Sequence, residues 1–380
     1  MTKSGKDSVL LYAVGDVAVS RDDPDSIFAL CASTTKQADI AFCQLETNYS
    51  ERGCPSSVCR VPMRANPRNA PSIKNAGFNV ISVAGNHCLD YGSEALLDTV
   101  DLIKSLGLEI LGAGGNMAEA REPVIVEKKG TKVAFLAYCS ILPHGYWAEE
   151  DKPGCAPMRA FTIYEQREHD QPGTPADVRT LANPGDLAAM VEDIQKVRKL
   201  ADVVIVSHHF GLHFIPAQIA DYQVEVAHAA IDAGADLILG HHAHILKGVE
   251  VYKGKVIPYS LCNFAFDNKP MTEKQLKSPR YQTLMKLNPS WVIDPEYPTY
   301  RFPADARKTL MLKCTITDKK IESVSFLPVY VNKQGQPEIL SGKDKRSQGV
   351  VDYVNWCSQE AGLNAQLSLA GDEIMISADG

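Results

Sequence analysis

Five short segments rich in metal-ligand residues punctuate this 380-residue chain, and each directly follows an apolar run. They are Gly15-Asp16 after Leu10–Val14, Glu46 after Ile40–Leu45, Gly85-Asn86-His87 after Val80–Ala84, His208-His209 after Val203–Ser207, and His241–His244 after Leu237–Gly240. Such runs are typical of buried strands, and an α/β sheet places its ligands at the carboxyl ends of strands. Carboxylate, amide and imidazole groups that converge there suit one or two divalent ions of manganese, zinc or iron. We therefore predict a metal centre.

The two histidine-rich segments carry the strongest signal. They hold five of the ten histidines in the chain. A single histidine at a strand end is most often structural, but five at two strand ends are hard to explain as core filler. Imidazole is the commonest metal ligand, and His242 and His244, as alternate residues of an extended segment, point to the same side. Metal binding by this cluster is the prediction that follows.

The other candidate residues are less specific when taken singly. Asp16 also fits a turn or a helix cap, and Glu46 also fits a solvent-facing strand end. Asn86 is a poor choice for the end of a buried run unless its amide oxygen has a partner, so it is a candidate neutral ligand. His87 projects differently and is a candidate proton donor or oxyanion contact. The alternative for this pair is a turn with a structural histidine.

Strand-like and helix-like segments alternate through the first two-thirds of the chain. Helical spacing of apolar residues predicts helices over Ser93–Leu106, Asp186–Leu200 and Ile219–Ala233, between the apolar strands and a further strand at Val133–Cys139. This order predicts a layered α/β domain. Further along, hairpins are expected at Val249–Tyr259 and Leu310–Val331, then a helix at Gln348–Glu360 and a strand at Ile374–Ser377. Antiparallel strands after β-α units indicate a mixed sandwich of two sheets.

Two long polar stretches interrupt this rhythm. Residues 144–184 and 268–308 are rich in proline and charge, and loops of this length are usually functional or disordered. We expect a core over residues 8–267 with an inserted loop region at 144–184. We expect a lid-like insertion at 268–308, after which residues 309–380 complete the same domain.

Composition narrows the class of protein. Hydrophobic residues make up 45% of the chain, enough for a large core, and the net charge of −7 argues against nucleic-acid binding. No signal peptide or membrane anchor is apparent at the polar N-terminus, so we expect reduced cysteines and a cytoplasmic location. Cys54 and Cys59 fit a redox or zinc pair, but an ordinary loop is favoured because a single pair is weak evidence.

The motifs together resemble the CapA family, which is linked to poly-γ-glutamate capsule biosynthesis within the calcineurin-like metallophosphoesterase superfamily. The resemblance extends in order from about Val9 to Asp267. The matching segments are Gly15-Asp16-Val17, Gln44-Leu45-Glu46, residues 86–92, residues 207–211, residues 240–244, and Tyr259–Phe264, with residues 112–114, 120–123 and 132–138.

This resemblance implies a four-layer αββα sandwich with its ligands at one edge. It implies that Glu46 bridges two metals, that Asp16 binds the first, and that Asn86 and His209 bind the second. His242 and His244 complete the sites, with His241 as an alternative to His242. His87 matches the superfamily histidine that touches the leaving group or oxyanion. Our candidate catalytic residues are His87, Asp90 and His208. The sequence departs from the superfamily at Ala18, where most members have a histidine. Members of the CapA family commonly lack this histidine too.

Three functions remain open on these grounds. The first is a metal-dependent hydrolase acting on a phosphoester or an amide or peptide-like bond of a small-molecule or peptide-like substrate. The second is synthesis or processing of poly-γ-glutamate. The third is a non-hydrolytic epimerase or isomerase with one ion and with His87 or His208 as base. A metal-free binding scaffold is disfavoured by the histidine cluster.

Overall fold

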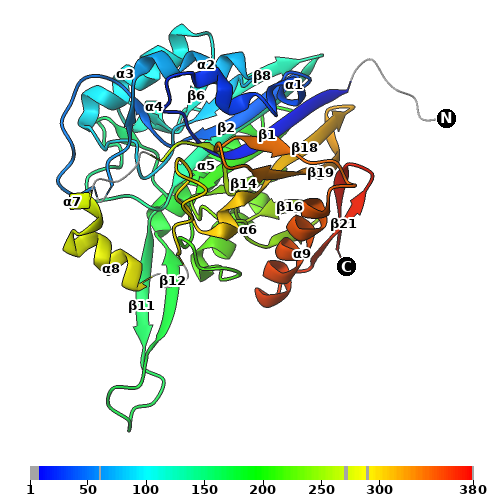
Figure 1. The fold of residues 1–380 in the computed structure, drawn as a ribbon. Helices are drawn as coiled ribbons and strands as arrows, with labels where there is room; N and C mark the ends of the chain where they lie inside the picture. The colour runs from blue at the N-terminus through cyan, green and yellow to red at the C-terminus, as the bar shows by residue number, and fades with distance from the viewer. Residues whose placement is uncertain (1–7, 60, 269–272, 288–290, 379–380) are drawn as a thin grey trace.

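Two β-sheets stack face to face and helices cover their outer sides (Figure 1). The computed structural model describes residues 8–59, 61–268, 273–287 and 291–378. Rings from both sheets meet between them, where Phe42 stacks on Phe135 with centroids 5.8 Å apart. A second core lies between the smaller sheet and its helices and includes Val206, Ile194 and Val226. The predicted αββα sandwich is confirmed.

The larger sheet combines parallel strands with an antiparallel C-terminal half. Its strands are β1 (Val9–Ala18), β2 (Ile40–Leu45), β5 (Val80–Ser82), β6 (Glu109–Leu111), β17 (Asn263–Phe266), β18 (Lys308–Thr317), β19 (Lys320–Val331), β20 (Pro337–Ile339), β21 (Ala365–Ala370) and β22 (Glu373–Ala378). The order is β21-β22-β19-β18-β1-β2-β5-β6, with β17 beside the end of β1 and β20 beside β19. The strands of residues 309–380 thus extend the sheet that contains β1.

The smaller sheet has the order β14-β13-β9-β8. Its strands are β8 (Val124–Lys128), β9 (Thr131–Cys139), β13 (Val203–His209) and β14 (Leu237–His241). Strands β9, β13 and β14 run parallel. Short pairs complete the strands: β3 (Asn48–Tyr49) with β4 (Arg64–Ala65), β7 (Ala113–Gly114) with β10 (Gly154–Cys155), β11 (Ala160–Glu165) with β12 (Asp177–Ala182), and β15 (Val249–Tyr252) with β16 (Lys255–Pro258).

The helices follow the predicted apolar spacing closely. They are α1 (Ala32–Thr35), α2 (Pro71–Asn75), α3 (Gly92–Ser105), α4 (Met117–Ala120), α5 (Pro184–Val197), α6 (Asp221–Ala233), α7 (Glu273–Leu276), α8 (Pro279–Leu287) and α9 (Lys345–Glu360), with 3-10 turns η1 (Pro24–Phe28), η2 (Pro67–Asn69) and η3 (Ala304–Arg307). Helix α3 buries Leu96, Val100 and Ile103 from one face. Asn183 caps the N-terminus of α5, because its side chain accepts hydrogen bonds from two backbone N–H groups. The predicted α3, α5, α6 and α9 are confirmed to within a few residues.

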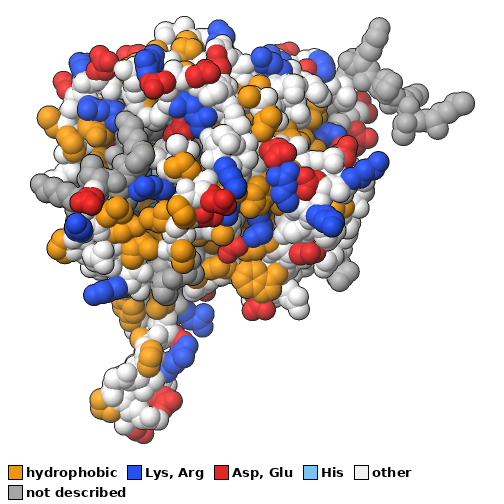
Figure 2. All heavy atoms as spheres, in the orientation of Figure 1, with side chains coloured by type: hydrophobic (Ala, Val, Ile, Leu, Met, Phe, Trp, Pro, Cys, Tyr) orange, Lys and Arg blue, Asp and Glu red, His pale blue; other side chains and the backbone are white. Residues whose placement is uncertain are grey.

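Residues 144–184 contain more regular structure than a loop. Strands β11 and β12 form a hairpin that projects from the body of the molecule (Figure 1). Phe161, Tyr164 and Val178 on it are exposed. Figure 2 shows this arm and, over the face drawn, acidic and basic side chains intermixed. The alternating pattern of these strands is partly hidden by threonine and charged residues, which explains why the sequence did not reveal the hairpin.

The inserted segment 268–308 carries α7, α8 and η3. Residues 269–272 and 288–290 of the predicted lid lie outside the described residues, and its role as a lid stays a prediction. Among the described residues, no helix has the length and apolar character needed to cross a bilayer.

A substitution at Gly15 tests the close packing of β1 against the backbone of Cys262. A Cβ at this position would lie 1.7 Å from the carbonyl oxygen of Cys262, a backbone atom that cannot move aside freely. We expect Gly15→Ala to lower the free energy of unfolding by about 3 kcal/mol, measured by urea denaturation. The control is Gly349→Ala in α9, where a Cβ meets nothing within 4 Å. It should be neutral or stabilising by up to about 1 kcal/mol; similar losses in both variants would contradict this packing argument.

Candidate metal centre

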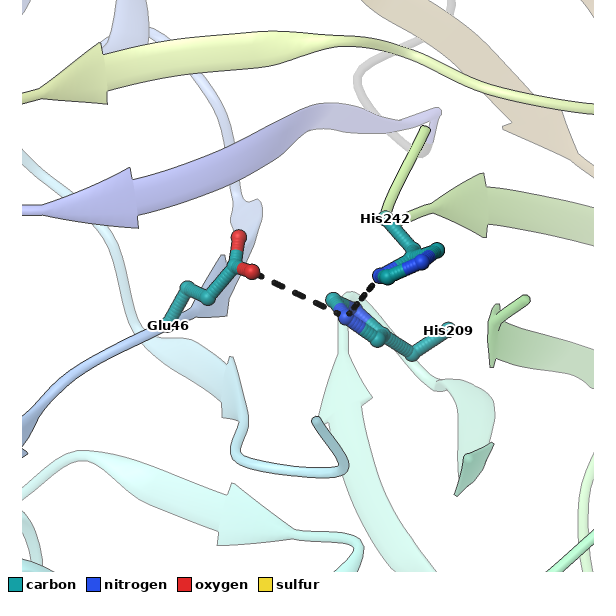
Figure 3. A group of neighbouring side chains, drawn as sticks. All are labelled: Glu46, His209 and His242. Atoms are coloured by element: carbon teal, nitrogen blue, oxygen red, sulfur yellow. Dashed lines mark hydrogen bonds and ion pairs between the residues drawn. The ribbon is translucent and has the colours of Figure 1, made fainter. Parts of the chain in front are cut away.

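Side chains from five strand ends meet at one edge of the sandwich. Asp16 lies near the end of β1, Glu46 directly after β2, Asn86 and His87 in the turn after β5, His209 at the end of β13, and His242 and His244 just after β14. Because β1, β2 and β5 run parallel in one sheet, and β13 and β14 run parallel in the other, these ends can converge. Figure 3 shows Glu46, His209 and His242 pointing toward one another.

Glu46 occupies the middle of the cluster. Its side chain is fully buried, and its Oε1 lies 3.5 Å from Nε2 of His244, 3.7 Å from Nε2 of His87 and 3.8 Å from Nε2 of His209. No amide, hydroxyl or imidazole among the described residues hydrogen-bonds to either carboxylate oxygen. A buried carboxylate without donors is costly, whereas a cation would satisfy it. The donor set therefore fits a metal ion.

One group of ligand atoms joins Glu46 to Asp16 and His244. Nδ1 of His244 lies 3.5 Å from Oδ2 of Asp16. The same Nδ1 donates a hydrogen bond of 2.6 Å to Oδ1 of Asn263, whose amide nitrogen donates to the Tyr300 hydroxyl at 3.1 Å. This chain of hydrogen bonds fixes the His244 ring so that Nε2 faces Glu46. Asn263 pairs directly with Asp16 across β17 and β1, which explains its place here.

A second group joins Glu46 to His209 and His242. Nε2 of His209 lies 2.6 Å from Oδ1 of Asn86 and 3.2 Å from Nδ1 of His242, which is itself 3.3 Å from the same amide oxygen. These two ring nitrogens and the amide oxygen are close enough to one another to contact a single ion. Glu46 is thus common to both groups, and each group has its own histidines.

Burial sets the protonation of these groups. Burial raises the pKa of the Glu46 carboxyl well above its usual value, and the negative charge of Asp16 adds to the rise. The pKa of Asp16 is raised for the same first reason. Burial lowers the pKa of His209 and His242, and lowers that of His244 to about 3. The histidines are therefore neutral at physiological pH, which is the form that binds metals.

The backbone is strained where it delivers these side chains. His242 and His244 have φ values of 88° and 55°, and Cys262 has 67°. Each residue with a side chain in this region costs on the order of 1–3 kcal/mol, so the surrounding packing must impose it. These positive φ angles direct the imidazoles of His242 and His244 toward Glu46. The segment therefore departs from the regular alternation of side chains expected of an extended strand.

His87 faces the cluster with one nitrogen and a carboxylate with the other. Its Nδ1 donates to Oδ2 of Asp90 at 2.5 Å, while its Nε2 points toward Glu46. Asp90 is fully buried and also accepts hydrogen bonds from the Met63 N–H and the Tyr146 hydroxyl. Asp90 therefore holds the His87 ring in place and belongs to neither of the two ligand groups that contain Glu46.

The structure does not bring His208 to this site, although the sequence suggested it as a catalytic residue. Side chains alternate along β13, so His209 faces the other sheet while His208 packs between the rings of Tyr138 and Phe210. Burial lowers the pKa of His208 to about 3. His241 stacks on Phe42 and belongs to neither ligand group, so the geometry favours His242 over His241 as the ligand.

Further side chains close the site on the His244 side. The ring of His213 lies 3.9 Å from that of His242, and Phe214 and Phe302 lie 5.6 Å and 5.1 Å from His244. Trp291 packs on Phe214. Sequence reasoning missed these residues because they come from a loop and from the 268–308 insertion. For His213 and Phe214, their closeness in sequence to the His208-His209 motif was the one indication that they lie near the site.

Comparison with known proteins identifies a family for most of this chain. Residues 10–268 match the sequence profile of the family described as "Bacterial capsule synthesis protein PGA_cap". The "PGA biosynthesis protein CapA" of Bacillus subtilis is 28% identical over 276 residues, which cover 70% of this chain and 65% of that protein. The "Capsule biosynthesis protein CapA" of Bacillus anthracis is 31% identical, over 54% of this chain and 44% of its own length.

The fold and the strand-end ligands define an αββα protein with a candidate metal centre. The chain belongs to the bacterial capsule synthesis protein family PGA_cap, which confirms the CapA resemblance. It spans less than two-thirds of the length of these two Bacillus relatives. Among solved structures, the calcineurin-like phosphoesterase YfkN from Bacillus subtilis aligns over 93% of this chain and 97% of its own, with a TM-score of 0.39 and 14% identity.

The neighbouring histidines 208 and 209 offer a matched test of the metal centre. His209→Ala removes the imidazole whose Nε2 lies beside the Asn86 amide oxygen in the second ligand group. We therefore expect the manganese that stays bound after loading and desalting to fall roughly tenfold or more. His208→Leu should leave the metal content unchanged, because its ring lies among Tyr138 and Phe210. Elemental analysis gives both values; an equal loss in the two variants would contradict the assignment of faces.

The burial of His208 also leads us to predict that the stability of the protein depends on pH. Its folded pKa of about 3 is below the unfolded value, so its contribution is fully present above about pH 6.5 and is lost as the pH falls. Between pH 7.5 and 5, wild type should lose about 2 kcal/mol more unfolding free energy than His208→Leu. Urea denaturation at both pH values measures this difference, and parallel losses would mean that the buried ring is protonated without cost.

Proposed function

We propose that this chain is a metal-dependent hydrolase with two divalent ions bound around Glu46. The observation that carries the proposal is that one buried carboxylate, free of hydrogen-bond donors in the described chain, is common to two groups of ligand atoms. Asp16 and His244 complete the first group, and His209 and His242 complete the second with the Asn86 amide. Such a shared carboxylate is what a pair of neighbouring cations needs.

The first group lacks the histidine that the superfamily usually has, because Ala18 stands there. Asn263 offers a partial replacement, since its amide oxygen lies at 2.6 Å from Nδ1 of His244 and its backbone pairs with Asp16. By accepting the Nδ1 proton it holds the lone pair of Nε2 toward Glu46, as outer-shell partners of metal ligands do. We infer that the first site binds its ion less tightly than the second.

The residues around Glu46 would hold divalent ions, which when bound would supply a hydroxide at neutral pH and polarise the oxygens of the scissile group. His87 supplies the complementary chemistry. Its Nδ1 proton is committed to Asp90, so Nε2 is the nitrogen that can hold or deliver a proton on the side of Glu46. His87 is 13% exposed, while the side chains of Glu46, His209 and His244 are 0–6% exposed. The substrate therefore approaches beside His87.

A phosphoester is the bond that this arrangement of residues fits best, because two ions held by them would stabilise both the attacking and the leaving oxygen. An amide bond of a glutamate polymer is the second candidate, supported by family membership and by the relatives whose names refer to PGA biosynthesis. The isomerase alternative loses one of its two bases, because His208 lies in the opposite core.

The proposal is tested with manganese-loaded protein, bis(p-nitrophenyl) phosphate and poly-γ-glutamate. Turnover of the phosphodiester that a chelator abolishes and manganese restores would support the phosphoesterase. New amino termini released from the polymer would support the amide hydrolase. Full metal loading with neither activity would overturn both readings.

His87 provides a prediction that separates chemistry from metal binding. We expect His87→Ala to lower kcat by about 100-fold or more while manganese content stays unchanged, because the ring contributes a proton and no ligand atom to either group. Asp90→Asn should lower kcat less, because it loosens the ring without removing it. The exposed His144→Ala is the control and should keep both kcat and metal content. Loss of metal in His87→Ala would show that this histidine is a ligand.

A further inference from the structure

A separate group of potential ligands lies behind His87, on the side away from Glu46. The Cys59 sulfur, a ring nitrogen of His87 and a carboxylate oxygen of Asp90 all lie within 4.8 Å of one another. Cys59 and Asp90 are buried, at 7% and 0% exposure. The hydroxyl of Tyr146 lies 3.2 Å from Oδ1 of Asp90 and borders the same space. Neither the proposed reaction nor the family relationship assigns a role to Cys59.

These three groups differ in chemistry from the ligands around Glu46. A thiolate, an imidazole and a carboxylate are a typical donor set for zinc, and thiolates select Zn²⁺ and Cd²⁺ strongly over Mn²⁺. The charges also balance, because a divalent cation neutralises one thiolate and one carboxylate in a buried place. The oxygen-rich group of Asp16 and Glu46 accepts harder ions. Softer and harder metal ions can therefore bind at separate sites on the two sides of His87.

We propose that Cys59, His87 and Asp90 bind Zn²⁺ or Cd²⁺ at an inhibitory site, a proposal that rests on the catalytic role of His87 given above. The Cys59 S–H bond breaks and its proton goes to solvent, while bonds form from the ion to sulfur, to Nδ1 and to the carboxylate. The proton that His87 Nδ1 donates to Asp90 is also released to solvent, and Nε2 takes one up from solvent, so the ring stays neutral with its single proton now on Nε2. Nothing is oxidised or reduced.

Inhibition follows from the geometry of His87 and Asp90. Their hydrogen-bonded atoms are 2.5 Å apart, whereas a nitrogen and an oxygen that share a tetrahedral zinc ion are separated by roughly 3.3 Å. The ring must therefore move away from Asp90, which shifts Nε2 relative to Glu46. A misplacement of about 1 Å can reduce a rate by about 100-fold.

Cadmium absorbance tests the binding without any turnover. Protein saturated with Mn²⁺ is titrated with Cd²⁺ while the ultraviolet thiolate-to-cadmium band is recorded. Wild type should gain a band that saturates at one equivalent, and Cys59→Ser should lack it. Cys54→Ser is the matched control, because Cys54 lies five residues upstream and is exposed; it should retain the band. Cys59→Ala gives a second variant with the same expectation if serine disturbs folding.

Zinc inhibition tests the consequence in the same proteins. Basal turnover should be unchanged in Cys59→Ser, and the Zn²⁺ concentration for half inhibition should rise at least tenfold, with no rise in Cys54→Ser. An undiminished cadmium band or equal zinc sensitivity in Cys59→Ser would overturn the site and leave these three residues as a hydrogen-bond network only. Absence of turnover in all variants would instead count against the hydrolase, because the band does not depend on it.

Discussion

The burial of the Glu46 carboxylate is the constraint on which the rest of the site depends. An ionised carboxylate with no hydrogen-bond donor costs several kcal/mol in a protein interior, and its pKa is raised accordingly. The surrounding histidines cannot offset this cost by protonation, because burial lowers their own pKa values. A divalent cation would resolve both problems, since it would satisfy the carboxylate and accept the imidazole lone pairs.

The fold meets this constraint by bringing two sheets together at their carboxyl edge. The backbone of Gly15 lies against the Cys262 carbonyl, and the strained segment from His242 to His244 directs two rings at one carboxylate. Strain of this kind persists only where neighbouring structure imposes it. Here the parallel pairing of β17 with β1 places Asn263 beside Asp16, so the same contact supports both the backbone and the His244 ring. Stability and metal geometry are therefore coupled in this edge of the molecule.

Much of this arrangement was predictable from local sequence. The apolar runs before Asp16, Glu46 and His209 showed where strands end, and the family resemblance supplied their common edge. Alternation along β13 shows that His208 and His209 face opposite sides without showing which one faces the site, and only the family resemblance pointed to His209 as the ligand. The contributions of His213 and Trp291 were also inaccessible, since they depend on how a loop and an insertion pack in three dimensions. Exposed strands β11 and β12 lack a clear apolar alternation, so the sequence predicts a loop where the structure has a hairpin.

The most direct test of the account is an anomalous difference map from crystals grown with Mn²⁺ and measured at the manganese absorption edge. We predict two peaks in contact with the Glu46 carboxylate, one beside Asp16 and His244 and the other beside Asn86, His209 and His242. Saturating Mn²⁺ with no anomalous peak within coordination distance of Glu46 would contradict it, because the buried carboxylate would then have a purpose other than holding metal.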